Sequence, residues 1–309
     1  MKIGYYICGK VGDSVVAISS LYAIKKYFPE CELYVFTNTT GKFFYQTFSW
    51  IDFIILVDQL PHIPDCHLDF FISTDSTKDT KIKLQKTIKC KILTFSKLHN
   101  LFDFQFKTTF SFTTSSIEKR LLKLPKLIPH QRHNDFNLSQ TPKINPPLSY
   151  QKKIRLFLDQ NNPNHLKTIL VNPFGFSQND NLPLQTYAKI IENLIQDTFV
   201  IIPTFADKRD LIQSHFPDNL LTHPNFCIFH NNEDLLNITE LIRQIDLLFS
   251  IDTGLIHIAN NLQIKTIGLF LHRKTARKWG SRCTKCIYIN QLKIQKVAKI
   301  CTQEIYNLL

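Results

Sequence analysis

Two short stretches of the 309-residue chain combine a tight turn with side chains that could do chemistry. The first, residues 9–14, follows an apolar run and sets Gly9 and Gly12 beside Asp13. Glycine permits close backbone approach, and a carboxylate at a helix start is held near the crevice of an α/β sheet. Asp also caps helices readily, and spacing alone favours that structural role for Asp13. The third glycine of a dinucleotide fingerprint is absent.

The second stretch, residues 250–257, follows another apolar run. Thr253 and Gly254 place backbone N–H groups and a hydroxyl at a helix start, which suits a phosphate or diphosphate. His257 lies four residues after Thr253 and therefore shares its helix face, where it could donate to the same anion. Asp252 could accept from sugar hydroxyls or only cap the helix. A buried, satisfied histidine is an equally good interpretation of His257.

The elements that must position these residues alternate between short apolar runs and amphipathic runs, which predicts an α/β fold with parallel sheets and helical crossovers. Residues 138–149 are polar and rich in proline, so we place a linker there. The expected domains are residues 1–149 and 150–309. We expect the last helix, about residues 294–309, to pack back toward the first domain.

The net charge of +12, from 37 Lys and Arg against 25 Asp and Glu, favours an anionic partner, although an AT-rich genome would give the same lysine excess. No apolar run is long enough to span a bilayer and no signal peptide is evident, so we expect a cytoplasmic protein. Cys283 and Cys286 have redox or metal spacing without a second ligand pair, and we interpret them as incidental thiols.

Four stretches, in order, resemble glycosyltransferase family 9, the lipopolysaccharide heptosyltransferases. They are the opening strand, Gly-Asp turn and helix of residues 9–33, the Asn-Pro-Gly loop of residues 169–175, the Asp-Thr-Gly signature within residues 240–259, and the Trp-Gly pair at residues 279–280. The resemblance spans almost the whole chain. It is strongest in the last third and weakest between about residues 60 and 145.

The resemblance implies a GT-B architecture, in which two Rossmann-like doubly wound domains face each other across a cleft, the first for the acceptor and the second for the donor. It implies an inverting transfer with no metal and no cofactor, with Asp13 as the general base. Lys10 and Gly12 lie in the same acceptor-side loop. The donor-binding positions of the family match Asn172, Asp252, Thr253, Gly254 and His257.

The implied function is transfer of heptose from ADP-heptose to a lipopolysaccharide core or lipid A precursor, in the cytoplasm or peripherally at the inner membrane. One departure matters: the family's Lys or Arg before Trp-Pro is missing from residues 177–183, where Asp180 or Asn181 stands instead. Two alternatives remain open. The protein could use a different donor sugar, or it could be a non-catalytic protein of the same fold that binds a nucleotide sugar or a glycan. Nucleic acid is not an expected partner, because no base-reading module is present. We treat the lysines of residues 78–91 as a solvated helix face.

Overall fold

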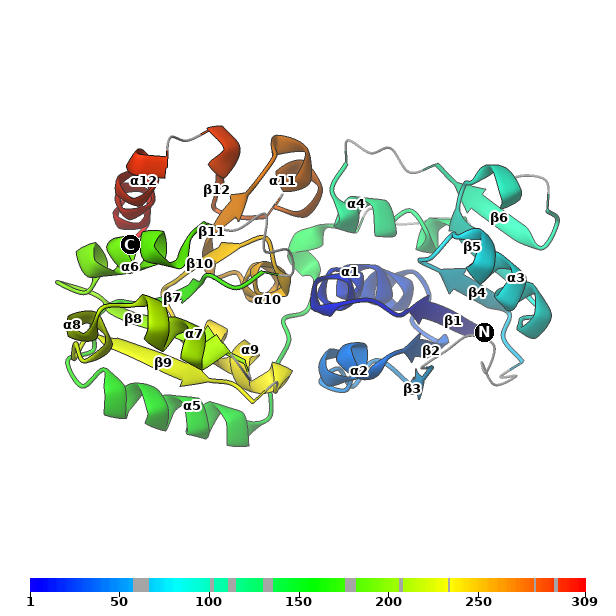
Figure 1. Ribbon diagram of the computed structural model, residues 1–309. Helices are drawn as coiled ribbons and strands as arrows, with labels where there is room; N and C mark the ends of the chain where they lie inside the picture. Colours follow the sequence, from blue (N-terminus) through cyan, green and yellow to red (C-terminus); the bar gives the residue numbers. More distant parts are fainter. Residues whose placement is uncertain are drawn as a thin grey trace. The chain divides into compact units, whose positions relative to one another are not determined.

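The computed structural model describes residues 1–57, 67–100, 103–110, 115–129, 136–175, 182–205, 208–232, 234–280, 282–291 and 294–309. The chain divides into two compact units, Met1–Ile144 and Asn145–Leu309. Each unit contains its own parallel sheet, and Figure 1 shows helices flanking both sheets. The α/β fold class expected from the sequence, with two doubly wound units, is confirmed.

The first unit has a six-stranded parallel sheet in the order β3-β2-β1-β4-β5-β6. Its strands are β1 (Lys2–Ile7), β2 (Glu32–Thr37), β3 (Phe53–Leu56), β4 (Phe70–Ser73), β5 (Lys91–Phe95) and β6 (Phe106–Thr109). Among the described residues its helices are α1 (Val11–Tyr27), α2 (Thr39–Tyr45), α3 (Lys78–Thr87) and α4 (Ile117–Leu121), with 3-10 turns η1 (Leu98–Asn100), η2 (Pro125–Leu127) and η3 (Leu138–Gln140). The strand order reverses between β1 and β4, which is where ligands bind in such sheets.

The second unit repeats this topology, with the order β12-β11-β10-β7-β8-β9. Its strands are β7 (Thr168–Asn172), β8 (Phe199–Thr204), β9 (Phe226–His230), β10 (Leu247–Ile251), β11 (Lys265–Phe270) and β12 (Lys285–Tyr288). The described helices are α5 (Leu148–Asn161), α6 (Leu184–Leu194), α7 (Lys208–His215), α8 (Asp218–Leu221), α9 (Leu235–Gln244), α10 (Gly254–Leu262), α11 (Arg273–Trp279) and α12 (Ile294–Tyr306), with the 3-10 turn η5 (Ile289–Gln291). Its reversal lies between β7 and β10.

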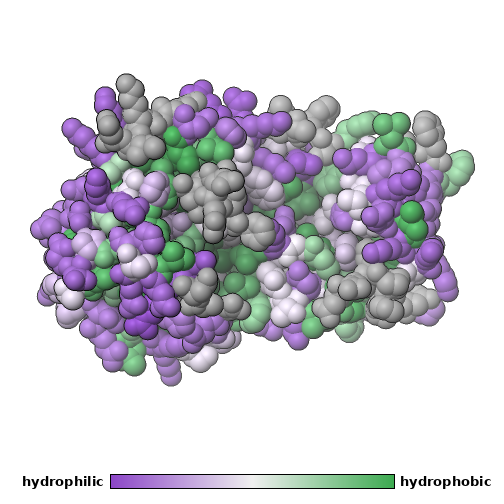
Figure 2. All heavy atoms as spheres, in the orientation of Figure 1, coloured by the Kyte–Doolittle hydropathy of each residue, from purple (hydrophilic) through white to green (hydrophobic). Residues whose placement is uncertain are grey.

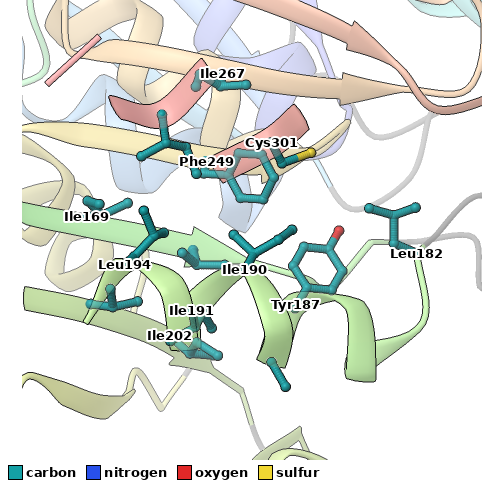
Figure 3. Close-up of a cluster of buried hydrophobic side chains, with 14 of the residues drawn as sticks. Ile169, Leu182, Tyr187, Ile190, Ile191, Leu194, Ile202, Phe249, Ile267 and Cys301 are labelled. Carbon is teal, nitrogen blue, oxygen red and sulfur yellow. The ribbon is translucent and has the colours of Figure 1, made fainter. Parts of the chain in front are cut away.

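The core of the second unit joins α6, the sheet and the last helix. Figure 3 shows Tyr187 and Ile190 of α6 near Phe249 of β10 and Cys301 of α12, all in one buried cluster. Val297, Cys301 and Ile305 recur every four residues, so α12 presents one apolar face, and that face packs on α6. The apolar stripe of α12 therefore completes the core of the second unit.

Helix α1 of the first unit begins at Val11, directly after the Gly9–Lys10 turn. Eleven of its residues are buried, including the polar Ser14, Ser19 and Ser20. The Ser20 hydroxyl donates to the Leu121 carbonyl oxygen at 3.1 Å, and the Tyr45 hydroxyl donates to the Ser14 carbonyl oxygen at 3.0 Å. The helix is therefore fixed to its neighbours by hydrogen bonds as well as by packing.

No helix among the described residues has the length and apolarity needed to cross a lipid bilayer.

Candidate functional site

The turn between β1 and α1 holds Asp13 in the third position of the helix. Its carboxylate Oδ2 accepts a hydrogen bond from the Lys10 backbone N–H at 3.1 Å. A Cβ added to Gly9 would lie 2.5 Å from the Asp13 Cβ and 2.9 Å from Oδ2. Glycine at position 9 is therefore required by the Asp13 side chain that packs over it, rather than by a left-handed backbone. Gly12 and Lys10 belong to the same turn, at and just before the first turn of α1.

Asp13 lines a pocket of about 640 Å³ that lies wholly within the first unit. The pocket sits at the carboxyl ends of β1, β4 and β5, where the strand order reverses, and α4 closes one side. Its lining residues are Ile7, Asp13, Val16, Thr74, Asp75, Ser76, Thr77, Lys78, Phe95, Ser96, Lys97, His99, Ile117, Arg120 and Leu121. The pocket thus combines an apolar floor with two half-buried carboxylates, Asp13 and Asp75, and three cationic side chains.

The loop after β4 forms one wall of this pocket and is fixed by a second carboxylate. Asp75 accepts from the Thr77 backbone N–H at 2.9 Å and from the Thr80 hydroxyl at 2.5 Å. The His99 imidazole Nε2 lies 3.0 Å from the Ser76 carbonyl oxygen and joins this loop to the end of β5. The hydrogen bonds of the Asp75 carboxylate hold its own loop, which gives Asp75 a structural role. The Asp13 carboxylate accepts one backbone hydrogen bond and is held less fully.

Arg120 faces the same pocket from α4. Its guanidinium lies over the Phe95 ring, 5.7 Å from the ring centroid, and burial lowers the pKa of Arg120. Stacking on an aromatic ring fixes the plane of a guanidinium, and guanidinium groups recognise carboxylates and phosphates. Among the lining residues, the sequence pointed to Asp13 through its Gly-Asp turn. The other lining residues carry no motif that could have identified them.

In the second unit, the turn between β10 and α10 is built around Asn172. The Asn172 amide Nδ2 lies 3.0 Å from the Ser250 hydroxyl, 3.2 Å from the Thr253 hydroxyl and 3.2 Å from the Phe174 carbonyl oxygen. Asn172 ends β7 and Ser250 lies on β10, so this amide ties together the two strands that flank the reversal. These hydrogen bonds offset the free-energy cost of burying the Asn172 amide.

Thr253 is the residue before α10, and its backbone is extended. Its hydroxyl makes no capping bond to the helix and is instead held by Asn172 and Ser250. The amide groups of the first turn of α10, beginning at Gly254, are therefore not occupied by the side chain that usually caps them. Such a helix start suits an anion. Asp252, directly before it, is exposed.

His257 lies in the second turn of α10 and is buried, with its ring edge against Trp279 at a centroid distance of 5.5 Å. Burial, together with the positive charge of Arg282, lowers the pKa of His257 to about 4. The imidazole is therefore neutral near pH 7, and it retains one N–H that can donate to a ligand oxygen. Trp279 and Arg282 extend the environment of His257 beyond the predicted residues. The Trp-Gly pair in the sequence was the only signal for them.

The structure thus brings Asn172, Thr253, Gly254 and His257 together in the second unit, and places Asp13, Gly12 and Lys10 together in the first. Asp180 and Asn181, which stand where the family has a Lys or Arg, lie outside the described part of the chain. Leu182, which stands at the family's Trp position, is buried in the core of the second unit. Within the described ranges, no group of three or more His, Cys, Asp or Glu side chains is placed to hold a metal ion.

The sequence matches the model of one family, Glycosyltransferase family 9 (heptosyltransferase), over residues 130–306. A comparison with curated proteins finds no match.

Among solved structures, the ADP-heptose lipopolysaccharide heptosyltransferase II of E. coli is 12% identical, with a TM-score of 0.73 and 99% of each chain covered. The E. coli heptosyltransferase WaaC with ADP is 10% identical, with a TM-score of 0.74, covering 100% of this chain and 99% of that one. A family 9 glycosyltransferase of Veillonella parvula is 12% identical, with a TM-score of 0.72 and coverages of 86% and 80%. At these identities the likeness shows the fold.

Proposed function

Because the chain belongs to glycosyltransferase family 9, we propose that it transfers heptose from ADP-heptose to a lipopolysaccharide core acceptor. That it is a glycosyltransferase follows from the family; the donor, the acceptor and the mechanism are the proposal. The solved neighbour WaaC is described with ADP and with ADP-2-deoxy-2-fluoro heptose, which supports an ADP-linked donor. We assign one substrate to each unit.

The acceptor belongs in the pocket of the first unit. Asp13 is the general base there, because its carboxylate lines the pocket and is oriented by the Lys10 N–H. Arg120, Lys97 and Lys78 line the same pocket and would pair with the phosphate or carboxylate groups of an inner-core acceptor. A pocket that holds both a base and several cations suits an anionic sugar with a nucleophilic hydroxyl.

The donor belongs at the start of α10 in the second unit. The diphosphate would accept hydrogen bonds from the first-turn amides, the Thr253 hydroxyl and the neutral His257 imidazole. Asp252, exposed beside them, is positioned to accept from hydroxyls of the donor sugar. Arg282, whose charge reaches His257, would supply positive charge to the diphosphate, a role that residues 177–183 do not provide through a Lys or Arg.

The chemical step is a single displacement. Asp13 takes the proton from the acceptor hydroxyl while that oxygen attacks the anomeric carbon, and the bond to the nucleoside diphosphate breaks on the opposite face. The new glycosidic bond has inverted configuration, and the leaving diphosphate carries the negative charge. The helix start, His257 and Arg282 stabilise that charge, so the proposed step needs no metal ion.

The observation that carries this proposal is that the Asp13 carboxylate lines the pocket of the first unit and packs over Gly9, which makes room for it. The test is transfer by the purified protein from ADP-heptose to a heptose-deficient core oligosaccharide, with UDP- and GDP-sugars as matched donors. We expect product with the ADP-linked donor and inversion at the anomeric carbon by NMR. Equal turnover with UDP- or GDP-sugars would reject the ADP donor, and a retained configuration would reject Asp13 as the base.

A further inference from the structure

Two cysteines of the second unit lie in contact at the start of β12. Cys283 precedes this edge strand, Cys286 lies on it, and their side chains are hydrogen-bonded to each other. Both are free thiols and both are half-buried, so small molecules in solvent can reach them. Their spacing alone favoured incidental thiols, but the contact between the two sulfur atoms changes that interpretation.

Two glycines and a helix hold this pair in place. The Gly280 carbonyl oxygen accepts from the Cys283 backbone N–H at 3.0 Å and from the Cys286 thiol at 3.5 Å, so both cysteines are bound to one peptide group. Gly268 of β11 pairs with Cys286 across the sheet, and a Cβ added there would lie 3.1 Å from the Cys283 Sγ. The Asn260 amide of α10 lies 4.0 Å from the same sulfur. The fold therefore fixes the two thiols against each other.

The two thiols differ in acidity. The hydrogen bond from the Cys283 thiol lowers the pKa of Cys286, although burial and the charge of Asp252 oppose this change. The same hydrogen bond, followed by burial, raises the pKa of Cys283. Cys286 is therefore the sulfur that ionises first, and the thiolate is the form that attacks a disulfide.

The segment directly before the pair is basic. Helix α11 carries four Lys or Arg residues and no Asp or Glu, and Figure 2 shows a mostly hydrophilic surface over this part of the second unit. Arg282 is the residue next to Cys283. Positive charge near a thiol favours the thiolate and attracts small anions. A small disulfide that carries carboxylates, such as oxidised glutathione, suits this surface.

We propose that Cys283 and Cys286 form a redox-active dithiol site that exchanges with small-molecule disulfides. The Cys286 thiolate attacks one sulfur of the small disulfide, and the first thiolate leaves. The Cys283 sulfur, having lost its proton to solvent, then attacks the Cys286 sulfur, and the second thiolate leaves. The two cysteines lose two electrons and become a disulfide, while the small disulfide gains them and, with two protons from solvent, becomes two thiols.

Oxidation of the pair would reach the candidate donor site, and in this respect the inference rests on the proposed function. Gly280 follows Trp279, whose ring lies against His257, and the charge of Arg282 also reaches His257. A disulfide draws the two sulfur atoms to about 2 Å and removes the thiol that donates to the Gly280 carbonyl. We therefore expect the Trp279 side of the site to shift and the oxidised protein to bind ADP more weakly.

The first test is chemical. The reduced full chain is equilibrated with mixtures of reduced and oxidised glutathione, alkylated with iodoacetamide and analysed by peptide mass spectrometry. We expect a disulfide between Cys283 and Cys286 that dithiothreitol reverses. Cys283→Ser should stop at a mixed disulfide on Cys286, formed about 10-fold faster than the one that Cys286→Ser forms on Cys283.

The matched control is Cys227→Ser. Cys227 is also half-buried, but burial raises its pKa to about 12, so it should not react, and the variant should oxidise like the wild type. The mass measurement on the wild type needs no variant, so a variant that fails to fold leaves it standing.

The second test measures the link to the donor site. In a Trp50→Phe background, the fluorescence of Trp279 should differ between the reduced and the oxidised protein. Calorimetric titration should show ADP affinity about fivefold or more lower after oxidation. The double variant Cys283→Ser with Cys286→Ser, treated with oxidised glutathione in the same way, should show neither change.

Absence of the Cys283–Cys286 disulfide in the wild type, or equal reaction rates of the two single variants, would overturn the dithiol site. A disulfide that leaves both Trp279 fluorescence and ADP affinity unchanged would overturn its link to the donor site. Disulfide formation and fluorescence are measured without nucleotide. A reduced protein that does not bind ADP would therefore count against the proposed function and not against the dithiol site.

Discussion

The β1–α1 turn and the β10–α10 turn lie at the strand-order reversals of two sheets with the same topology, yet they are built for opposite tasks. The first turn presents a carboxylate, Asp13, held by one backbone N–H over a glycine. The second presents hydrogen-bond donors, because Asn172 and Ser250 hold the Thr253 hydroxyl away from the helix start. One turn is suited to accept a proton and the other to receive an anion.

The comparison teaches that the fold supplies the position and the turn residues supply the chemistry. In the first unit the ligand pocket spans the ends of β1, β4 and β5. In the second unit, strand β7 contributes Asn172 to the candidate site, and its amide donates a hydrogen bond to the Ser250 hydroxyl of β10. The following predictions separate the two turns, from the largest expected effect to the smallest.

Asp13→Asn should reduce sugar transfer by about 10²- to 10⁴-fold, because it keeps the shape of the side chain and removes the proton acceptor. ADP affinity, which belongs to the other turn, should stay within about twofold. Turnover, ADP titration and melting temperature are measured on the same preparation. Near-normal turnover in a folded variant would leave Asp13 with its structural role alone.

His257 should make the second unit sensitive to acid. Its pKa is about 4 in the folded protein, below the value of 6.5 expected when unfolded, so its contribution to stability is fully present above pH 6.5 and is lost as the pH falls toward 4. The free energy of unfolding should fall by about 3 kcal/mol more in the wild type than in His257→Gln between pH 7 and 4. Urea unfolding followed by Trp279 fluorescence, in a Trp50→Phe background, measures this. If the difference in the free energy of unfolding between the wild type and His257→Gln were the same at pH 7 and pH 4, His257 would not be buried in its neutral form.

Gly254→Val should weaken ADP binding by about 30-fold, since a branched side chain at the start of α10 would obstruct the approach of the diphosphate to the backbone amides. Calorimetric titration with ADP gives the affinity directly. Gly12→Val, in the turn of the other unit, is the control and should leave ADP affinity unchanged. If both variants bind ADP like the wild type, the diphosphate lies elsewhere.

Gly9→Ala should reduce turnover by about 10-fold with little effect on ADP affinity. The added Cβ would stand 2.5 Å from the Asp13 Cβ, so the side chain must move and its bond to the Lys10 N–H must change. Steady-state kinetics at saturating donor tests this. Turnover equal to the wild type would show that the exact placement of the carboxylate does not matter.

Much of the fold could be predicted from the sequence, because most strands are continuous apolar runs buried on both faces. Strands β5 and β11 are of this kind, because every residue after the first is buried. Some short strands could not be predicted from the sequence. Strands β6 and β12 have four residues each and lie at sheet edges, and no continuous apolar run marks them. Helix α2 contains Gly41, which an apolar-periodicity pattern does not favour; the glycine is needed because Thr37 crowds it.

The candidate site was partly predictable for a different reason. Asp13, Thr253 and Gly254 lie in turns whose residue types signal chemistry in the chain itself. The Asn172 tie, the Arg120–Phe95 stack and the Trp279–His257 contact join residues far apart in sequence, and only the fold makes them neighbours.

The burial of α1 on nearly every side has a consequence for the opening motions of the first unit. Helix ends usually fray, but the first turn of α1 is followed at once by residues with no exposed side, beginning at Ser14. Amide hydrogens early in this helix should therefore exchange with solvent only when the whole unit opens, as slowly as those of the central strand β1. Asp13 would then be carried by the part of the unit that unfolds last, and partial unfolding elsewhere would leave the carboxylate in place.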